Sequence, residues 1–175
     1  MEQRKVFEIE SLKGGHTYRG VPQNGDSSFI VPIVYVQPKF DELLRRFPAF
    51  ANPAFKGMRF DPIESCKGVP TNVGSREVAF EYFHINQKMT TEEVLAEMDH
   101  NGLRPALYEE LLGFAEKYPD EQEQYWIVAL GSETEDVYCI RSVAVLCDIG
   151  DGRDLILSWS NDDWDASDRF LAVRK

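Results

Sequence analysis

The stretch EVAFEYFHINQKMTTEEVLAEMDHNG, residues 77–102, contains the clearest local signals of the fold. Its first nine residues alternate in side-chain direction and are rich in aromatic residues, which predicts a strand. Thr90 and Glu93 have the spacing of a capping box, so a helix is expected to begin directly after Thr90. Asn101 and Gly102 are typical of a helix end. The stretch therefore predicts one strand followed by one helix with defined ends.

A second helix and four strands are predicted downstream of this stretch. RPALYEELLGFAEKYP predicts a helix that begins near Pro105, has apolar residues on one side and ends at Pro119. The DEQEQ sequence after it is expected to be a solvated, charge-rich turn. YWIVALGS, VYCIRSVAVLCD, RDLILSW and RFLAVRK then read as strands separated by Gly- and Asp-rich turns. This order predicts an α+β fold with two helices and a mostly antiparallel sheet.

Residues 1–76 have a different character. Turn-forming sequences such as KGGHTYRG, QNGDSS and KGVPTNVGS dominate them. SFIVPIVYVQP reads as an edge strand interrupted by Pro32, and KFDELLRRF as a short helix at most. We therefore expect an N-terminal extension over residues 1–76, which packs on the main domain or mediates oligomerisation, and a main domain over residues 77–175.

Composition excludes several classes of protein. With 43% apolar residues the 175-residue chain can bury a core. The net charge of −11 argues against nucleic-acid binding, which needs clustered Lys and Arg. No apolar run reaches the roughly 18 residues of a membrane span, so no membrane insertion is expected. MEQRKVFEIE has no signal-peptide pattern, so the cytoplasm is the default location, with display on a cell surface or a virion left open.

Signs of catalysis are missing from the sequence. His16, His84 and His100 lie far apart, and no nucleophile elbow, phosphate loop or metalloprotease motif is present. His84 is expected to be packed or paired within a strand. We therefore expect a protein that is not an enzyme and that needs no cofactor.

The cysteines do not have metal-ligand spacing. Cys66, Cys139 and Cys147 are expected to be free packed thiols, with a disulfide between Cys139 and Cys147 as the alternative. The Asp-rich end of the chain offers oxygen ligands of the kind that Ca²⁺ takes, but it lacks the spacing of an EF-hand. No metal site is predicted, and calcium binding stays an open alternative.

The acidic residues change in type near residue 136. The chain has 17 Glu and 5 Asp up to Glu135, but 8 Asp and no Glu from Asp136 onward. Gln and Met are also absent from this last part. Strands disfavour both Asp and Glu, and the preference of turns for Asp explains only part of the change. A further rule is needed to account for the residue types here.

The sequence SWSNDDWDASD, residues 158–168, concentrates this change, and we call it the polar segment. It contains four Asp, three Ser and one Asn around two Trp residues. Together with the preceding RDLILSW strand, the following RFLAVRK strand and the stretch from MTTEEVLAEMDHNG to VALGS, it resembles the variable proteins of diversity-generating retroelements. The resemblance covers residues 77–175 and implies a C-type lectin fold with a hypervariable ligand-binding surface and no catalysis.

The resemblance also implies which residue types can vary. In this family an error-prone reverse transcriptase rewrites adenines, so that AAY codons become NNY codons, which encode neither Glu, Gln, Lys, Met nor Trp. Trp159 and Trp164 are therefore expected to be scaffold residues that anchor the site. The expected ligand-binding, variable residues are Ser158, Ser160, Asn161, Asp162, Asp165, Ala166, Ser167 and Asp168. Further candidates, for which a simple turn is the alternative explanation, are Asp148, Asp151, Arg153 and Asp154. The resemblance is broken at Leu107, where Thr is expected as the helix cap.

The charge of this surface suggests its partner. Residues 148–168 contain seven Asp and one Arg, so we expect a protein or surface ligand with a basic or polar patch. A calcium-dependent carbohydrate-binding lectin remains an alternative, because WSND is similar to the Trp-Asn-Asp element of such lectins. An enzyme of the formylglycine-generating type, with a similar fold but a required Cys pair near the chain end, is another. A structural or assembly protein with a turn-rich tail is the last.

Overall fold

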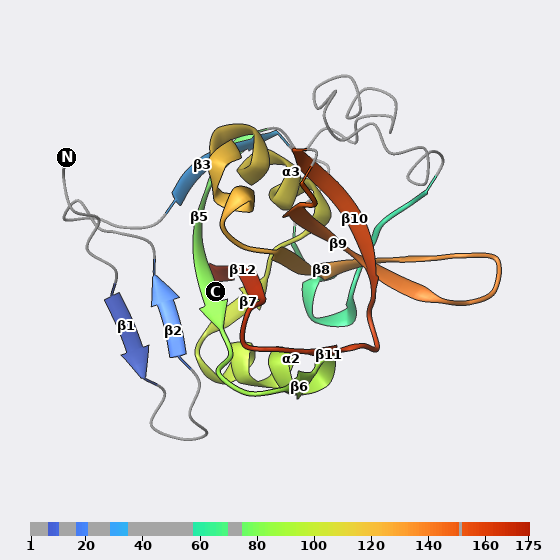
Figure 1. Cartoon of the computed structure of the whole chain (residues 1–175), viewed down its shortest axis with the longest axis horizontal. Helices are drawn as coiled ribbons and strands as arrows, with labels where there is room; N and C mark the ends of the chain where they lie inside the picture. Colours follow the sequence, from blue (N-terminus) through green and yellow to red (C-terminus); the bar gives the residue numbers. More distant parts are fainter. Residues whose placement is uncertain (1–6, 11–16, 21–28, 35–57, 70–74, 151) are drawn as a thin grey trace.

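The computed structural model describes residues 7–10, 17–20, 29–34, 58–69, 75–150 and 152–175. In this part the chain is α+β, with two α-helices, α2 (Thr91–His100) and α3 (Tyr108–Lys117), and a mostly antiparallel sheet. Figure 1 shows α3 and α2 on opposite sides of the sheet. The fold class predicted from the order of elements is confirmed at this level.

The C-terminal strand of the chain, residues 169–174, lies at the centre of the sheet. The strand order is β1 (Phe7–Glu10), β2 (Thr17–Gly20), β5 (Ser75–His84), β12 (Arg169–Arg174), β8 (Ile127–Glu135), β9 (Arg141–Asp148) and β10 (Arg153–Trp159). β12 lies antiparallel to β5 and parallel to β8. Short strands complete the arrangement: β3 (Phe29–Val34) pairs with β5, β4 (Asp61–Pro62) with β8, β7 (Leu103–Pro105) with β12, and β6 (Met89–Thr90) with β11 (Asp163–Trp164).

Strands of the N-terminal part join this sheet. β2 and β3 both pair with β5 in antiparallel register. The expected boundary between residues 76 and 77 falls inside β5, which begins at Ser75. The KFDELLRRF sequence lies outside the residues that the structure describes.

The core forms two layers because the central strands are buried on both faces. On β5, Phe80 and Tyr82 pack in the layer that contains α3, whereas Phe83 packs with α2. β12 alternates in the same way, with Leu171 on the α3 side and Phe170 on the α2 side. Side chains that alternate across a strand can fill both layers when both faces are covered.

The two helices differ in how well the sequence locates their starts. Thr90 caps α2, and Glu93 completes the capping box, as predicted. α3 begins at Tyr108 instead of near Pro105, because Pro105 is the last residue of β7. The prediction of the earlier start was wrong.

Glu110 of α3 itself and Ser132 of β8 cap the start of the helix, because Leu107 at the cap position has no polar side chain. Glu110 Oε2 accepts a hydrogen bond from the Leu107 N–H at 2.8 Å, and Ser132 Oγ accepts one from the Tyr108 N–H at 3.1 Å. Glu110 is fully buried and also forms a two-pronged ion pair with Arg104, with N···O distances of 2.7 and 2.8 Å. The start of α3 thus depends on particular buried side chains.

The DEQEQ sequence is not the solvated turn that we expected. It belongs to the 3₁₀ helix η4 (Pro119–Glu123), in which Glu121 and Gln122 are buried. Gln122 Nε2 donates to the carbonyl oxygens of Cys147 and Asp154 at 2.8 and 3.1 Å. The Tyr82 hydroxyl donates to Glu121 Oε2. This charge-rich sequence therefore forms a short helix. Its Gln122 side chain bonds to β9 and β10, and its Glu121 side chain bonds to Tyr82 in the α3 layer.

Candidate functional site

The polar segment connects β10 to the central strand β12. It runs past the N-terminal end of α2, where β11 pairs with β6 (Figure 1). Its backbone is therefore paired with the main domain in the middle of the segment as well as at both ends. The segment therefore lies at the surface and packs against the sheet and α2.

The two Trp residues of the segment have different environments. Trp164 is buried, donates from Nε1 to Thr91 Oγ1 at 2.8 Å, and meets the Phe170 ring edge-to-face at 5.6 Å. Trp159 is 58% exposed. Trp159 is the last residue of β10 and its side chain lies at the surface, so the anchoring expected of both indoles is seen only for Trp164.

The carbonyl groups at the end of the segment are held by two framework side chains. Arg169 Nη1 donates to the carbonyl oxygens of Ala166, Ser167 and Asp168 at 3.0–3.2 Å. His84 Nε2 lies 2.7 Å from the same Ala166 oxygen. Arg169 and His84 are paired residues on β12 and β5. A single residue pair of the sheet therefore holds the turn at residues 166–168.

This anchoring was missed in the sequence. The sequence places Arg169 in an ordinary strand and predicts only that His84 is packed or paired. The Arg169 guanidinium also lies over the Tyr125 ring, at 4.8 Å from its centre, which helps to hold it under the turn. No local signal marks these roles, because the residues meet only once β5 and β12 have paired.

Ser160 is anchored at the other end of the segment. Its carbonyl oxygen accepts a hydrogen bond from Thr91 Oγ1, and its N–H donates to the Arg141 oxygen at 3.0 Å. The residue is 8% exposed. Ser160 therefore offers little surface to a ligand, although it borders the groove of about 1050 Å³ beside the hairpin between β8 and β9.

Side chains inside the last turn also bond to one another. Asp165 Oδ1 accepts from the N–H and the hydroxyl of Ser167, and Asp168 Oδ2 accepts from the Asp165 N–H. The hydrogen bonds from Ser167 lower the pKa of Asp165. Burial raises the pKa of Asp168, despite its bond to the Asp165 N–H. In this sequence Asp165 and Asp168 thus also shape the turn.

A groove of about 580 Å³ gathers many of the predicted residues. Trp126, which precedes β8 and is 47% exposed, forms part of its wall, and Lys88 pairs with Asp163 at 2.9 Å within it. Trp126 was not singled out from the sequence, where it reads only as the start of a strand. The expected variable residues in the lining are Ser158, Asp162, Asp165, Ser167 and Asp168.

Asn161 and Ala166 complete the exposed part of the segment. Both side chains are exposed, and neither is among the residues that line this groove. They lie beside the groove-lining residues in sequence, so the polar segment offers one continuous surface.

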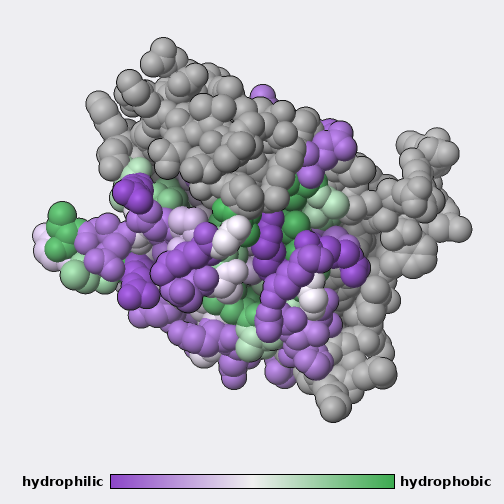
Figure 2. All heavy atoms as spheres, turned by 180° about the vertical axis from the view of Figure 1, so that it is seen from behind, coloured by the Kyte–Doolittle hydropathy of each residue, from purple (hydrophilic) through white to green (hydrophobic). Residues whose placement is uncertain are grey.

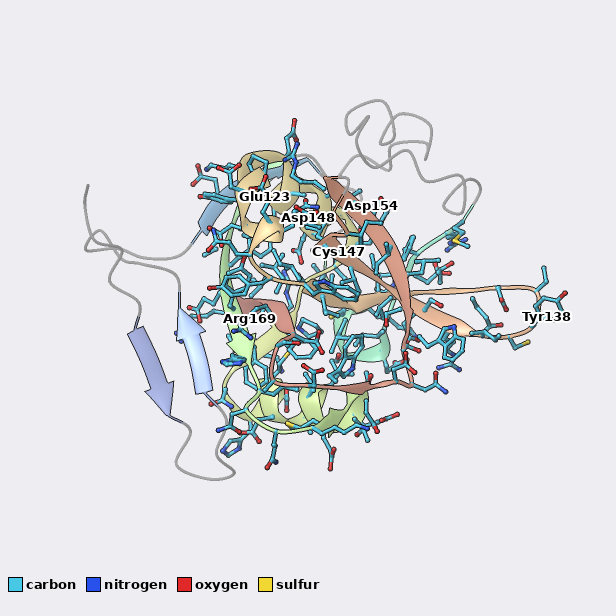
Figure 3. The ribbon with its side chains drawn as sticks, viewed as in Figure 1. Glu123, Tyr138, Cys147, Asp148, Asp154 and Arg169 are labelled. Atoms are coloured by element: carbon cyan, nitrogen blue, oxygen red, sulfur yellow. The ribbon has the colours of Figure 1, made fainter. Side chains whose placement is uncertain are left out.

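The remaining candidates lie at the opposite end of β10. Asp148, Arg153 and Asp154 are half-buried and do not line the groove. Figure 3 shows Asp148 and Asp154 beside Cys147, well away from Arg169. Asp148 Oδ1 accepts from the Gly150 N–H, as in a simple turn. Asp151 lies outside the described residues.

The part of the chain that the structure describes gives little sign of reactive or metal-binding chemistry. Cys66, Cys139 and Cys147 are free, and burial together with Asp154 and Asp148 raises the pKa of Cys147 to about 11. Over the described ranges, no group of three or more His, Cys, Asp or Glu residues could hold a metal ion. No helix among the described residues is long and apolar enough to cross a membrane.

Comparison of the chain with protein-family models, with curated proteins and with solved structures gives no match.

Proposed function

We propose that this chain is a non-catalytic binding protein with a C-type lectin fold, in which retroelement-driven mutagenesis diversifies the side chains of the polar segment. The resemblance of residues 77–175 to such variable proteins supports this proposal. So does the loss of Glu, Gln and Met after residue 135. The observation that carries it is the way in which Arg169, His84 and Thr91 hold the backbone of the segment.

A hydrogen bond to a backbone carbonyl does not depend on the side chain of the residue that supplies the carbonyl. The contacts from Arg169 to the carbonyl groups of residues 166–168 therefore do not require particular side chains at those residues. Exposed substitutions away from packed features change stability by only about ±0.5 kcal/mol. Such a segment can change its binding surface while the fold keeps its shape.

The structure refines which residues would recognise a ligand. Ser158, Asp162, Ser167 and their neighbours in the groove supply small polar and acidic contacts. Trp126 and Trp159 supply exposed indole surface, of the kind that contributes most at binding hot spots. We assign Ser160 and Trp164 to the support of the segment, since both are buried.

The ligand of this copy is proposed to be a protein surface with a basic or polar patch. Asp162, Asp163, Asp165 and Asp168 line the groove, and Lys88 is the one basic residue among the described residues of its lining. Acidic groups at the rim steer a basic partner and make association weaken as salt is added. Charge reversal of Asp162 and Asp165 is therefore expected to remove most of the salt dependence of binding.

The test of the proposal is the DNA around the coding sequence. We expect a reverse-transcriptase gene and a near-identical template repeat that differs from the coding segment at adenines. The differences should fall at codons for exposed residues such as Asn161, Asp162 and Ala166. The codons for Trp164, Arg169 and Thr91 serve as the control and should be unchanged. Absence of a repeat, or differences at the Arg169 codon, would refute the proposal.

A further inference from the structure

The hairpin that joins β8 to β9 projects from the body of the protein. It extends to the right in Figure 1, and its tip carries hydrophobic atoms at the left edge of Figure 2. At this tip Val137 is 90% exposed, Tyr138 is 80% exposed and Ile140 is 41% exposed. Figure 3 shows Tyr138 at the end farthest from the sheet. An apolar cluster so far from the core does not contribute to the core of its own chain.

Hydrogen bonds to Asp136 order the turn at the tip of the hairpin. Asp136 Oδ1 accepts hydrogen bonds from the N–H groups of Tyr138 and Ile140, at 2.8 and 3.0 Å. The Asp136 N–H donates to the Ile140 oxygen at 3.1 Å, and Cys139 adopts a left-handed φ of 60°. The apolar side chains are thus presented by a preorganised loop, which lowers the entropy lost when they bind.

A groove of about 1050 Å³ lies beside the same hairpin. Cys139, Ile140 and Arg141 line one wall, and the other walls come mainly from α2, β7, the 3₁₀ helix η3 (Glu64–Cys66) and the start of the polar segment, where Ser160 and Asn161 lie. Its apolar lining includes Ile63, Leu95 and Leu103.

The charge of this groove differs from that of the chain as a whole. Its described lining has four basic and four acidic side chains, whereas the chain carries a net charge of −11. The groove is therefore a place where a second acidic molecule can approach with little repulsion.

We propose that the groove receives the β8–β9 hairpin of a second copy of this chain, and that the contact is reciprocal. Because the hairpin borders the groove that it would enter, a two-fold axis beside the groove places each hairpin along the groove of the other copy. Such an isologous contact closes on itself and gives a dimer. The two grooves share no described lining residue, but both border the polar segment: Ser160 and Asn161 line this groove, and Asp162 and Asp163 line the acidic groove with Trp126.

The first test is the mass of the whole chain in solution, measured by light scattering over a range of concentrations. We expect twice the 20.1 kDa chain mass, with a dimer that dissociates on dilution. Tyr138→Asp at the hairpin tip and Ala96→Glu in the groove should each raise the dissociation constant at least about tenfold. Ile149→Asp is the matched control, because Ile149 is 57% exposed on a different turn, and it should leave the mass unchanged.

The second test asks whether the hairpin of one copy lies in the groove of the other. An Ala96→Cys, Cys139→Ser chain is mixed with the unmodified chain, which has Cys139 exposed and its other two cysteines buried. Mild oxidation should give a reducible cross-linked dimer of the two different chains, which only contact between molecules can produce. Cys139→Ser in both chains should abolish it.

Monomer mass at the highest concentration would overturn the proposal. So would a dimer that Tyr138→Asp and Ala96→Glu leave intact, or one that gives no cross-link between Ala96→Cys and Cys139. Circular dichroism of each variant separates dissociation from unfolding, and both substituted side chains lie at the surface.

Discussion

The start of α3 and the polar segment are held in place in opposite ways. At the start of α3, the buried carboxylate of Glu110 bonds to Arg104 and to the Leu107 N–H, so the side chain itself keeps the structure in place. In the last turn of the polar segment, Arg169 and His84 instead hold backbone carbonyl groups. The contrast predicts that substitution of Glu110 costs more stability than substitution of the exposed residues of the polar segment.

Removing Glu110 should have the largest effect. Glu110→Ala is expected to lower the free energy of unfolding by about 3–5 kcal/mol, because it leaves Arg104 buried without this carboxylate. It also removes the acceptor of the Leu107 N–H. Chemical denaturation measures the change. Glu116→Ala, at an exposed position of the same helix, should stay within about 0.5 kcal/mol. Equal losses for the two variants would contradict the role given to Glu110.

Removing Arg169 should have a smaller effect that centres on the polar segment. Arg169→Ala is expected to destabilise the protein by about 1.5–3 kcal/mol, the range for hydrogen bonds made by a charged group. Amide hydrogen exchange should speed up in residues 165–168 more than in α3. Arg59→Ala provides the comparison, because Arg59 pairs with Asp61 and both side chains are exposed, so its loss should cost only about 0–1 kcal/mol. Unchanged exchange in the turn would show that the carbonyl contacts do not hold it.

Substitutions within the polar segment should separate exposed from buried positions. Asn161→Tyr and Ala166→Tyr are expected to change the free energy of unfolding by no more than about 0.5 kcal/mol. Ser160→Tyr should cost about 1–3 kcal/mol, because a large side chain must enter a packed site. Thermal denaturation of the three variants tests the contrast. A loss at Ala166 as large as that at Ser160 would break it.

The two carboxylates of the last turn should titrate in a definite order. The pKa of Asp168 is raised by burial and that of Asp165 is lowered by its bonds to Ser167, so Asp168 takes up its proton first as the pH falls. Because the folded-state pKa of Asp165 is lowered, its contribution to stability is present at neutral pH and is lost as the pH falls through that pKa. Asp168 acts in the opposite sense. Because its folded-state pKa is raised, its protonation as the pH falls stabilises the folded state relative to the unfolded state.

Carboxylate NMR signals followed against pH test this order. Ser167→Ala should move the pKa of Asp165 back toward its ordinary value while Asp168 keeps the higher pKa. The reverse order of titration in the unmodified protein would contradict the hydrogen bonding of the turn.

Local patterns in the sequence located much of the fold. The capping box at Thr90 and the alternation in β5 depend on neighbouring residues, so they could be read directly. The start of α3 and the burial of Gln122 could not. Pro105 becomes part of β7 only by pairing with β12, and Gln122 is buried only because β9 and β10 lie over it.

The candidate site shows the same division. Residue types indicated the polar segment and its small polar side chains. They could not separate Ser160 from Asn161, because the burial of Ser160 depends on Thr91, which lies 69 positions away. Nor could they separate the two Trp residues, since only Trp164 reaches the Thr91 hydroxyl.

The pairing of β5 with β12 has a consequence for how fast the protein folds. Residues 84 and 169 are paired in the middle of the sheet, and both helices lie between them in sequence. A chain must therefore close a very long loop before its central strands meet. Proteins dominated by such distant pairings fold on the order of milliseconds to seconds, so slow refolding is expected here even for variants of unchanged stability.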